Sequence, residues 1–228
     1  MKDTSSENSS NPQIYGRVEI GLALGFVCLI VLLMVWPNID LVLSGLFFTK
    51  GVGFVQSPVL NFVRASLPYW IGGAVGFAFA MMKCGVISRK ALLFIVLAFA
   101  VGPGLVVNGV FKEHWGRARP AQVEPFGGKA QFTPVWLPTN QCDHNCSFTA
   151  GDPSVGFAFI AFAFVWPTRR KAIVAGTVLA GGALGLIRIA QGGHFASDVL
   201  FTGLVVLITT AVLARLFRPI QARPHVGL

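Results

Sequence analysis

The stretch ALLFIVLAFAVGPGLVVNGVF, residues 91–111, runs for 21 residues without a charged side chain. A helix needs about 20 apolar residues to cross the hydrocarbon core of a bilayer, so this stretch predicts a transmembrane helix. The composition of the whole chain agrees: of 228 residues, 54% are hydrophobic and 12% are charged, and the mean hydropathy is +0.68. Soluble domains carry about 25% charged residues. The sequence is therefore that of an integral membrane protein.

Five further apolar runs accompany this stretch. Together they predict an all-α, polytopic membrane protein with six transmembrane helices in one domain, residues 20–217. The run at 155–166 is the shortest and reaches spanning length only if its helix begins near Asp152. The six predicted spans are 20–36, 69–86, 91–111, 155–166, 172–189 and 199–217.

Both ends of the chain are polar. Residues 1–19 are rich in Ser and Asn, and they lack the basic start and early apolar core of a cleavable signal peptide. We therefore expect a disordered cytoplasmic N-terminal segment over 1–19 and a first span that is retained as an anchor. Residues 218–228 are expected to form a short cytoplasmic tail.

Basic residues indicate the orientation of the spans. In the six-span plan, eleven of the 18 Lys and Arg residues fall on one side of the membrane. The positive-inside rule makes that side cytoplasmic, with both termini, and makes the long loop 112–151 periplasmic. The formal net charge of +9 then reflects topology, so nucleic-acid binding is not expected. Six of the eleven lie in two short loops: Lys83, Arg89 and Lys90, and Arg169, Arg170 and Lys171.

The opposite side carries most of the residues that could perform chemistry. Charged residues at membrane depth are functional candidates by default. For Lys50, Arg64 or Arg117 taken singly, however, a plain interfacial anchor is the favoured interpretation. Eight candidates lie at the helix ends of this side or in its long loop: Lys112, Arg117, Arg119, His144, Asp152, Arg188, His194 and Asp198.

Three fixed cations and a histidine followed by a carboxylate indicate phosphoryl transfer. Lys112, Arg119 and Arg188 would neutralise the equatorial oxygens of a phosphate in the transition state. His194 is the candidate nucleophile. Asp198, four residues further along a helix, would accept the other ring N–H of His194. This chemistry needs no metal, and no cofactor is expected.

The spacing of these residues resembles the type 2 phosphatidic acid phosphatase superfamily. KEHWGRARP, residues 112–120, fits the first family motif: Lys, six residues, then Arg-Pro. RIAQGGHFASD, residues 188–198, fits the third: Arg, five residues, His, three residues, Asp. The resemblance covers about residues 36–217. It implies a six-helix fold, a lipid substrate in the membrane and a phosphohistidine intermediate formed without metal.

The middle family motif is altered in this chain. Family members usually read Pro-Ser-Gly-His, whereas residues 149–152 read Thr-Ala-Gly-Asp. The resemblance gives position 152 the leaving-group acid, which a carboxyl group can supply only when it is protonated. Three roles stay open for Asp152: a general acid, a carboxylate paired with Lys112 or Arg188, or an N-cap for the fourth span. An active-site role is predicted from its place in the motif.

The altered motif itself resembles the bacterial lipid A phosphatases, most closely those that remove the 4′-phosphate. This resemblance implies hydrolysis of a phosphate monoester of lipid A at the periplasmic face of the bacterial inner membrane. Undecaprenyl pyrophosphate phosphatase, phosphatidylglycerophosphate phosphatase and lipid A 1-phosphatase are alternatives within the enzyme class. A non-catalytic phospholipid binder or transporter is the alternative of another class. Asp152, in place of the family histidine, favours this non-catalytic alternative. His194 and Asp198 count against it, because a binder needs no nucleophile.

The long loop adds two further expectations. Its aromatic residues Phe126, Phe132 and Trp136 either cover the site or serve as a membrane anchor. Cys142 and Cys146 lie on the periplasmic side, where a disulfide is chemically allowed. The disulfide is favoured over free thiols, and a Cys-His zinc site is favoured least. The sequence does not indicate an oligomeric state.

Overall fold

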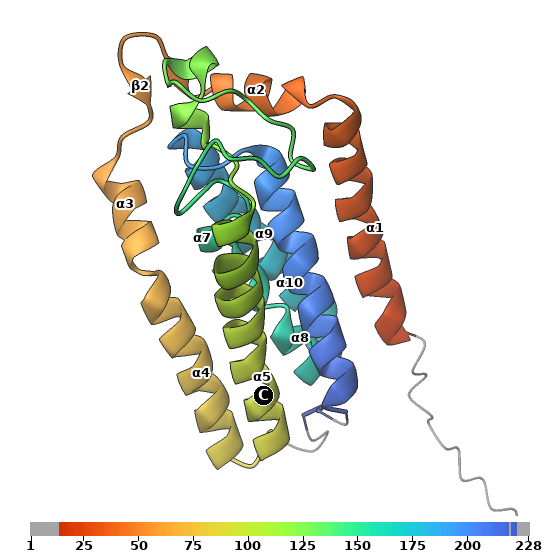
Figure 1. Cartoon of the computed structure of the whole chain (residues 1–228). Helices are drawn as coiled ribbons and strands as arrows, with labels where there is room; N and C mark the ends of the chain where they lie inside the picture. The colour runs from red at the N-terminus through yellow and green to blue at the C-terminus, as the bar shows by residue number, and fades with distance from the viewer. Residues whose placement is uncertain (1–13, 219, 223–228) are drawn as a thin grey trace, which may run out of the picture.

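A computed structural model describes residues 14–218 and 220–222 and shows a bundle of long helices (Figure 1). Four segments are long and apolar enough to cross a membrane: Pro58–Lys83, Arg89–His114, Pro167–Ala190 and Ala196–Leu216. Their elements are, in order, α3 (Pro58–Ala65) and α4 (Leu67–Lys83); α5 (Arg89–Phe99), the π-helix η1 (Ala100–Phe111) and α6 (Lys112–His114); η4 (Pro167–Arg169) and α9 (Arg170–Ala190); and α10 (Ala196–Leu216).

The first predicted span, 20–36, is followed by a sharp bend. α1 (Ile14–Val35) runs beside α10, whereas α2 (Asn38–Gly45) turns across the end of the bundle (Figure 1). Together the two helices are long and apolar enough to cross a membrane, and the angle between them is 98°. Because α1 begins at Ile14, the expectation of disorder over 1–19 is wrong for residues 14–19, and residues 1–13 lie outside the described part.

The fourth predicted span is short and interrupted. α7 (Gly151–Ala158) and α8 (Ala161–Val165) form an apolar stretch from 151 to 165, which falls below the length of a complete span. At 1.5 Å per residue it covers only ~22 Å. The described chain therefore has four candidate spans, or five with the bent pair, where six were predicted.

α7 is nevertheless the centre of the bundle. Every residue of α7 except Asp152 is buried. The helix packs so closely on α9 that a Cβ at Gly156 would lie 2.7 Å from the backbone nitrogen of Gly181. Close packing of this kind depends on small residues. The N-terminal end of α7, which carries Asp152, is thereby held against the C-terminal end of α9.

The two ends of the bundle differ in content. At one end, the backbone N–H of Ala222 donates to the carbonyl oxygen of Val165 (2.8 Å), so this part of the predicted tail is packed. The other end carries α2 and the antiparallel hairpin of β1 (Phe48–Thr49) and β2 (Gly53–Phe54) (Figure 1). The long loop, with the 3-10 turns η2 (Pro120–Gln122) and η3 (Glu124–Phe126), lies there as well.

Candidate active site

The predicted site residues meet at the end of the bundle that carries α2 and the long loop. The C-terminal end of α9 and the N-terminal ends of α7 and α10 point to this end, and the loop after α6 folds over it (Figure 1). The six residues are Lys112, Arg119, Asp152, Arg188, His194 and Asp198.

His194 lies just before α10 and is almost completely buried, with 2% of its surface exposed. Its Nδ1 is 2.5 Å from the carbonyl oxygen of Ser147. Since a carbonyl can only accept, Nδ1 carries the proton and Nε2 keeps its lone pair. Burial, followed by three nearby cations, lowers the pKa of His194 well below its usual value, so the ring is neutral at pH 7. Those cations are Arg188, Arg119 and Lys112.

Asp198 lies near His194 but does not accept the hydrogen bond that was predicted from the ring N–H of His194. Its Oδ1 accepts from Arg117 (2.5 Å), and its Oδ2 accepts from Ser147 Oγ (2.6 Å) and from the backbone N–H of Phe195 (2.8 Å). Among the hydrogen bonds of the described residues, none joins Asp198 directly to His194. Ser147 links the two instead, because its hydroxyl donates to Asp198 while its carbonyl accepts from His194.

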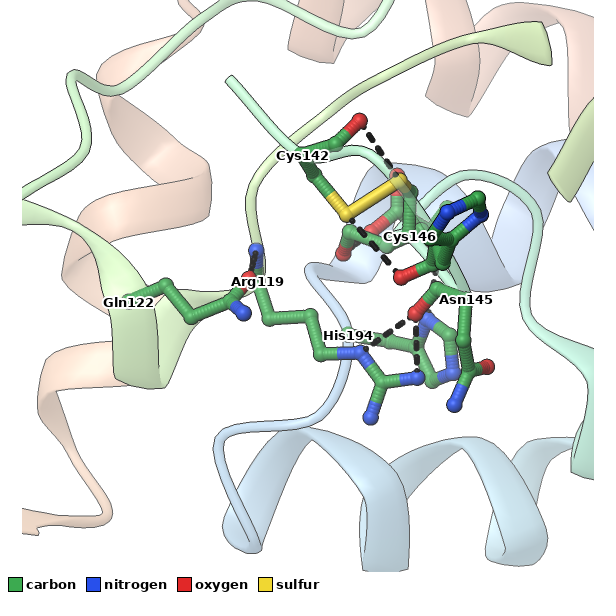
Figure 2. Close-up of a disulfide and its surroundings, with 9 residues drawn as sticks. Arg119, Gln122, Cys142, Asn145, Cys146 and His194 are labelled. Carbon is green, nitrogen blue, oxygen red and sulfur yellow. Dashed lines mark hydrogen bonds between the residues drawn. A yellow bond between two sulfur atoms is a disulfide. The ribbon is translucent and has the colours of Figure 1, made fainter. Parts of the chain in front are cut away.

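Arg119 is oriented by a small ring in the long loop (Figure 2). Its Nε and Nη2 both donate to the carbonyl oxygen of Asn145, at 3.0 and 2.6 Å. Its backbone N–H donates to Gln122 Oε1 (2.8 Å). Cys142 and Cys146 lie at disulfide distance, with their Cα atoms 5.7 Å apart, so the expected disulfide closes a ring around Asn145. Asn145 is left-handed there, with φ of 52°.

Two glycines make room for the other cations. A Cβ at Gly151 would lie 3.4 Å from Lys112 Nζ and 2.7 Å from Asn108 Oδ1, so the ammonium group lies over the start of α7. A Cβ at Gly193 would lie 2.2 Å from Arg188 Nη2. The guanidinium of Arg188 can therefore lie against the backbone that precedes His194 only because no side chain is present at 193.

Asp152 pairs with cations. Its Oδ2 lies 2.7 Å from Arg64 Nε and 3.3 Å from Arg188 Nε. The pairing with Arg188 was one of the three roles considered, and Arg64 is an additional partner. The N-cap role is wrong, because α7 begins at Gly151 with Ala150 as its N-cap and without a side-chain capping bond.

Two arginines interpreted as plain anchors have specific partners, and here the sequence-based interpretation was wrong. Arg64 lies on α3 and binds Asp152. Arg117 is fully buried and contacts both Asp198 and Asp40, which lies on α2. One signal was present in the sequence: Asp40 is an isolated acidic residue in the apolar segment 36–48. An unpaired carboxylate in such surroundings is costly, so it indicates a buried partner.

The aromatic residues of the long loop divide between the two expected roles. The ring of Phe126 packs on those of Phe48 and Phe54, each with its centroid 5.2 Å away. The ring of Phe132 packs on Phe195, beside His194, at 5.3 Å. Trp136 is 39% exposed. Two of the three rings therefore fix the loop over the site, and the third remains at the surface.

The charge of the site suits an anion. Four cations surround a region that holds one carboxylate, Asp152, next to the neutral His194. These cations are Arg64, Lys112, Arg119 and Arg188. Burial, followed by the like charge of Arg64, lowers the pKa of Arg119. Within residues 14–218 and 220–222, no group of three or more His, Cys, Asp or Glu side chains is placed to hold a metal ion. Phosphate oxygens are natural ligands for such a cluster of guanidinium and ammonium groups.

The sequence matches the PAP2 superfamily over residues 90–222, which includes all six predicted site residues. The chain belongs to the PAP2 superfamily. This confirms the resemblance inferred from the two motifs. The matched region begins at α5, so α1 to α4, with Asp40 and Arg64, lie outside the part that defines this PAP2 protein as a family member.

Named PAP2 relatives match between about half and most of the chain. The lipid A 4′-phosphatase of Francisella tularensis subsp. novicida is 39% identical, over 86% of this chain and 93% of that protein. The lipid A 4′-phosphatase of Rhizobium etli is 30% identical, over 79% of this chain and 80% of that protein. The lipid A 1-phosphatase of Rhizobium etli is 35% identical, but only over 55% of this chain and 50% of that protein. No solved structure matches.

Proposed function

We propose that this PAP2 protein hydrolyses the 4′-phosphate monoester of lipid A through a phosphohistidine intermediate. The observation that carries the proposal is the neutral imidazole of His194, with its Nε2 lone pair available, beside Lys112, Arg119 and Arg188. The relatives support the 4′ position, because the 4′-phosphatases match nearly the full chain and the 1-phosphatase only about half.

The reaction follows in two displacements. Nε2 of His194 attacks phosphorus, and the bond from phosphorus to the 4′ oxygen of the sugar breaks as that oxygen takes up a proton from the solvent, which the later attack of water returns. The cations neutralise the charge of the equatorial oxygens. Water then attacks the phosphohistidine, so that inorganic phosphate leaves and the imidazole is restored. Asp152 contributes by holding Arg64 and Arg188 at the phosphate.

We also propose that the site faces the periplasm and that both termini are cytoplasmic. In this arrangement α1 crosses the membrane, α2 lies along its surface, and the buried stretch 151–165 completes a sixth, short crossing. Arg89 and Lys90 begin α5 at the end of the bundle opposite the site, which supports a cytoplasmic location for that end. The phosphates of lipid A in the outer leaflet of the inner membrane would then lie at the depth of the site.

The test uses purified protein and bis-phosphorylated lipid A in mixed micelles. Mass spectrometry of the product identifies which phosphate is lost, and undecaprenyl pyrophosphate and phosphatidylglycerophosphate are offered in parallel. We expect loss of the 4′-phosphate from lipid A. We expect His194→Gln to reduce the rate about 1,000-fold or more, since the nucleophile is gone, and to prevent trapping of radiolabelled phosphate on the protein.

His144→Gln is the matched control, because His144 is exposed in the loop at the same end of the molecule. It should keep the wild-type rate. Full activity in His194→Gln would contradict the covalent mechanism. Phosphate release from another lipid alone would contradict the substrate, and lipid binding without any release would identify a binder rather than an enzyme.

A further inference from the structure

Arg117 is a fully buried cation enclosed by acceptors. Its Nη2 lies 2.9 Å from Asp40 Oδ2 and its Nη1 2.5 Å from Asp198 Oδ1. Nη1 also donates to Ser197 Oγ (2.9 Å), and Nε donates to the carbonyl oxygen of Thr133 (3.0 Å). Burying a guanidinium is expensive unless its donors are satisfied, and four such bonds do so here. We call Asp40, Arg117, Ser197 and Asp198 the buried ionic cluster.

Asp40 brings the interfacial helix α2 to the start of α10. Its Oδ1 accepts from the backbone N–H of Ser197 (2.9 Å), and its Oδ2 contacts Ser197 Oγ. Ser197 is the second residue of α10, and the first N–H groups of a helix have no partner within the helix. A carboxylate suits this position because the N-terminal end of a helix is partly positive.

The buried ionic cluster is connected to the candidate nucleophile through one residue. Asp198 accepts from Ser147 Oγ at 2.6 Å, and the carbonyl oxygen of Ser147 accepts from Nδ1 of His194 at 2.5 Å. The position of Ser147 therefore determines both which ring nitrogen carries the proton and where Nε2 points. Asp198 itself is held by Arg117, whose remaining carboxylate partner is Asp40.

We propose that Asp40 and Arg117 are positioning residues, which hold Asp198 and Ser147 so that Ser147 aims Nε2 of His194 at the phosphate. This extends the site into α2, outside the region that matches the PAP2 superfamily. The inference rests on the proposed role of His194 as nucleophile. It does not depend on lipid A being the substrate.

The experiment compares Asp40→Asn, Arg117→Lys and Ser147→Ala with Glu124→Gln. The control changes an exposed carboxylate of the long loop at the same end of the molecule. For Asp40→Asn we expect kcat to fall about 30-fold with KM nearly unchanged, since misplacing a catalytic group by ~1 Å can reduce the rate about 100-fold. Arg117→Lys keeps the charge and should recover part of the rate that Arg117→Met loses.

Orthovanadate affinity, measured by calorimetry, is a second readout that needs no lipid. Vanadate mimics the phosphoryl group in the transition state, and its tight binding needs Nε2 of His194 to point at the vanadium atom. His194→Ala should therefore abolish tight binding, and Asp40→Asn should weaken it about tenfold. If the wild type binds vanadate through His194 but releases no phosphate from lipid A, the proposed substrate is wrong and the positioning test still stands.

Ser147→Ala removes no buried charge, so it keeps the test decisive even if Asp40→Asn does not fold. It deletes the hydroxyl that reaches Asp198 and leaves the carbonyl that reaches His194. We expect a kcat about tenfold below wild type with an unchanged melting temperature. Wild-type kcat and vanadate affinity in Ser147→Ala, or in a folded Asp40→Asn, would overturn the proposal.

Discussion

Two ionic clusters flank the candidate nucleophile, and they are built in opposite ways. In the buried ionic cluster, one guanidinium, Arg117, lies between two carboxylates, Asp40 and Asp198, and all three side chains are at most 2% exposed. In the second, which we call the surface ionic cluster, one carboxylate lies between two guanidinium groups. Its members are Arg64, Asp152 and Arg188; the side chains of Arg64 and Asp152 are 35% and 28% exposed, whereas that of Arg188 is 6% exposed.

The difference indicates a division of labour. Breaking a buried ion pair leaves an uncompensated charge away from water, so the buried ionic cluster can have only one arrangement. Ion pairs that water reaches are worth little, about 0–1 kcal/mol, so the surface ionic cluster can exchange partners. An incoming phosphate can replace Asp152 as the ligand of an arginine there. In the proposed mechanism, the buried ionic cluster holds the histidine in position and the surface ionic cluster receives the substrate.

The strongest test of this contrast is to replace the phosphate-facing arginines by lysine. Arg119→Lys and Arg188→Lys keep the charge but lose the planar fork that binds two phosphate oxygens at once. We expect each to lose about 2 kcal/mol of transition-state stabilisation, or about 30-fold in kcat/KM. Arg89→Lys, at the opposite end of the bundle, is the control. Near-wild-type rates in both variants would show that these arginines only anchor helices.

A smaller effect is expected for Asp152→Asn. The amide oxygen can still accept from Arg64, so the surface ionic cluster should keep its arrangement and turnover should fall less than about tenfold. A lost general acid would reduce the rate by about 100-fold or more. Rates on lipid A from pH 5 to 8 distinguish the two roles. A large loss that is greatest at low pH, where a wild-type carboxyl group would be protonated, and that shrinks as pH rises would identify Asp152 as the proton donor.

The smallest effect concerns pH. Because the pKa of His194 is lowered, the neutral nucleophile should persist well below pH 6.5. In the pH profile of kcat/KM, the fall in rate on the acid side (the acid limb) should therefore also lie well below pH 6.5. Removing a nearby cation, as in Arg119→Gln, raises that pKa and should move the limb to higher pH. The phosphate of the substrate also titrates near pH 6, so wild type and variant are compared on one substrate. Coincident limbs would contradict the electrostatic influence of Arg119 on His194.

Motif spacing predicted which residues converge at one end of the bundle, because it indicates which residues lie at the ends of neighbouring helices. Lys112, Arg188 and His194 lie where spans end, and ends that share a side of the membrane converge. Spacing within one segment cannot show partners from another. Arg64 and Asp40 are contributed by α3 and α2, which carry no motif, so their contacts with Asp152 and Arg117 emerge only from the fold.

Apolar composition predicted the long helices but not their lengths or bends. Residues 155–166 are as apolar as a span, yet the helix is interrupted between Ala158 and Ala161 and remains short. It is stabilised by packing inside the bundle, where every residue of α7 except Asp152 is buried. Likewise, the apolar segment 20–45 does not reveal the 98° bend between α1 and α2. That bend is what places Asp40 at the start of α10.

The ring closed by Cys142 and Cys146 connects the export of the long loop with the geometry of the candidate active site. The carbonyl that orients Arg119 belongs to Asn145, inside this ring. In the proposed orientation the loop meets an oxidising compartment only after it has crossed the membrane. A newly synthesised chain would then complete its anion site upon export, and no cytoplasmic precursor would have the finished site. For the same reason, protein kept in a reductant would lack the closed ring that orients Arg119, whereas protein purified without reductant would keep it.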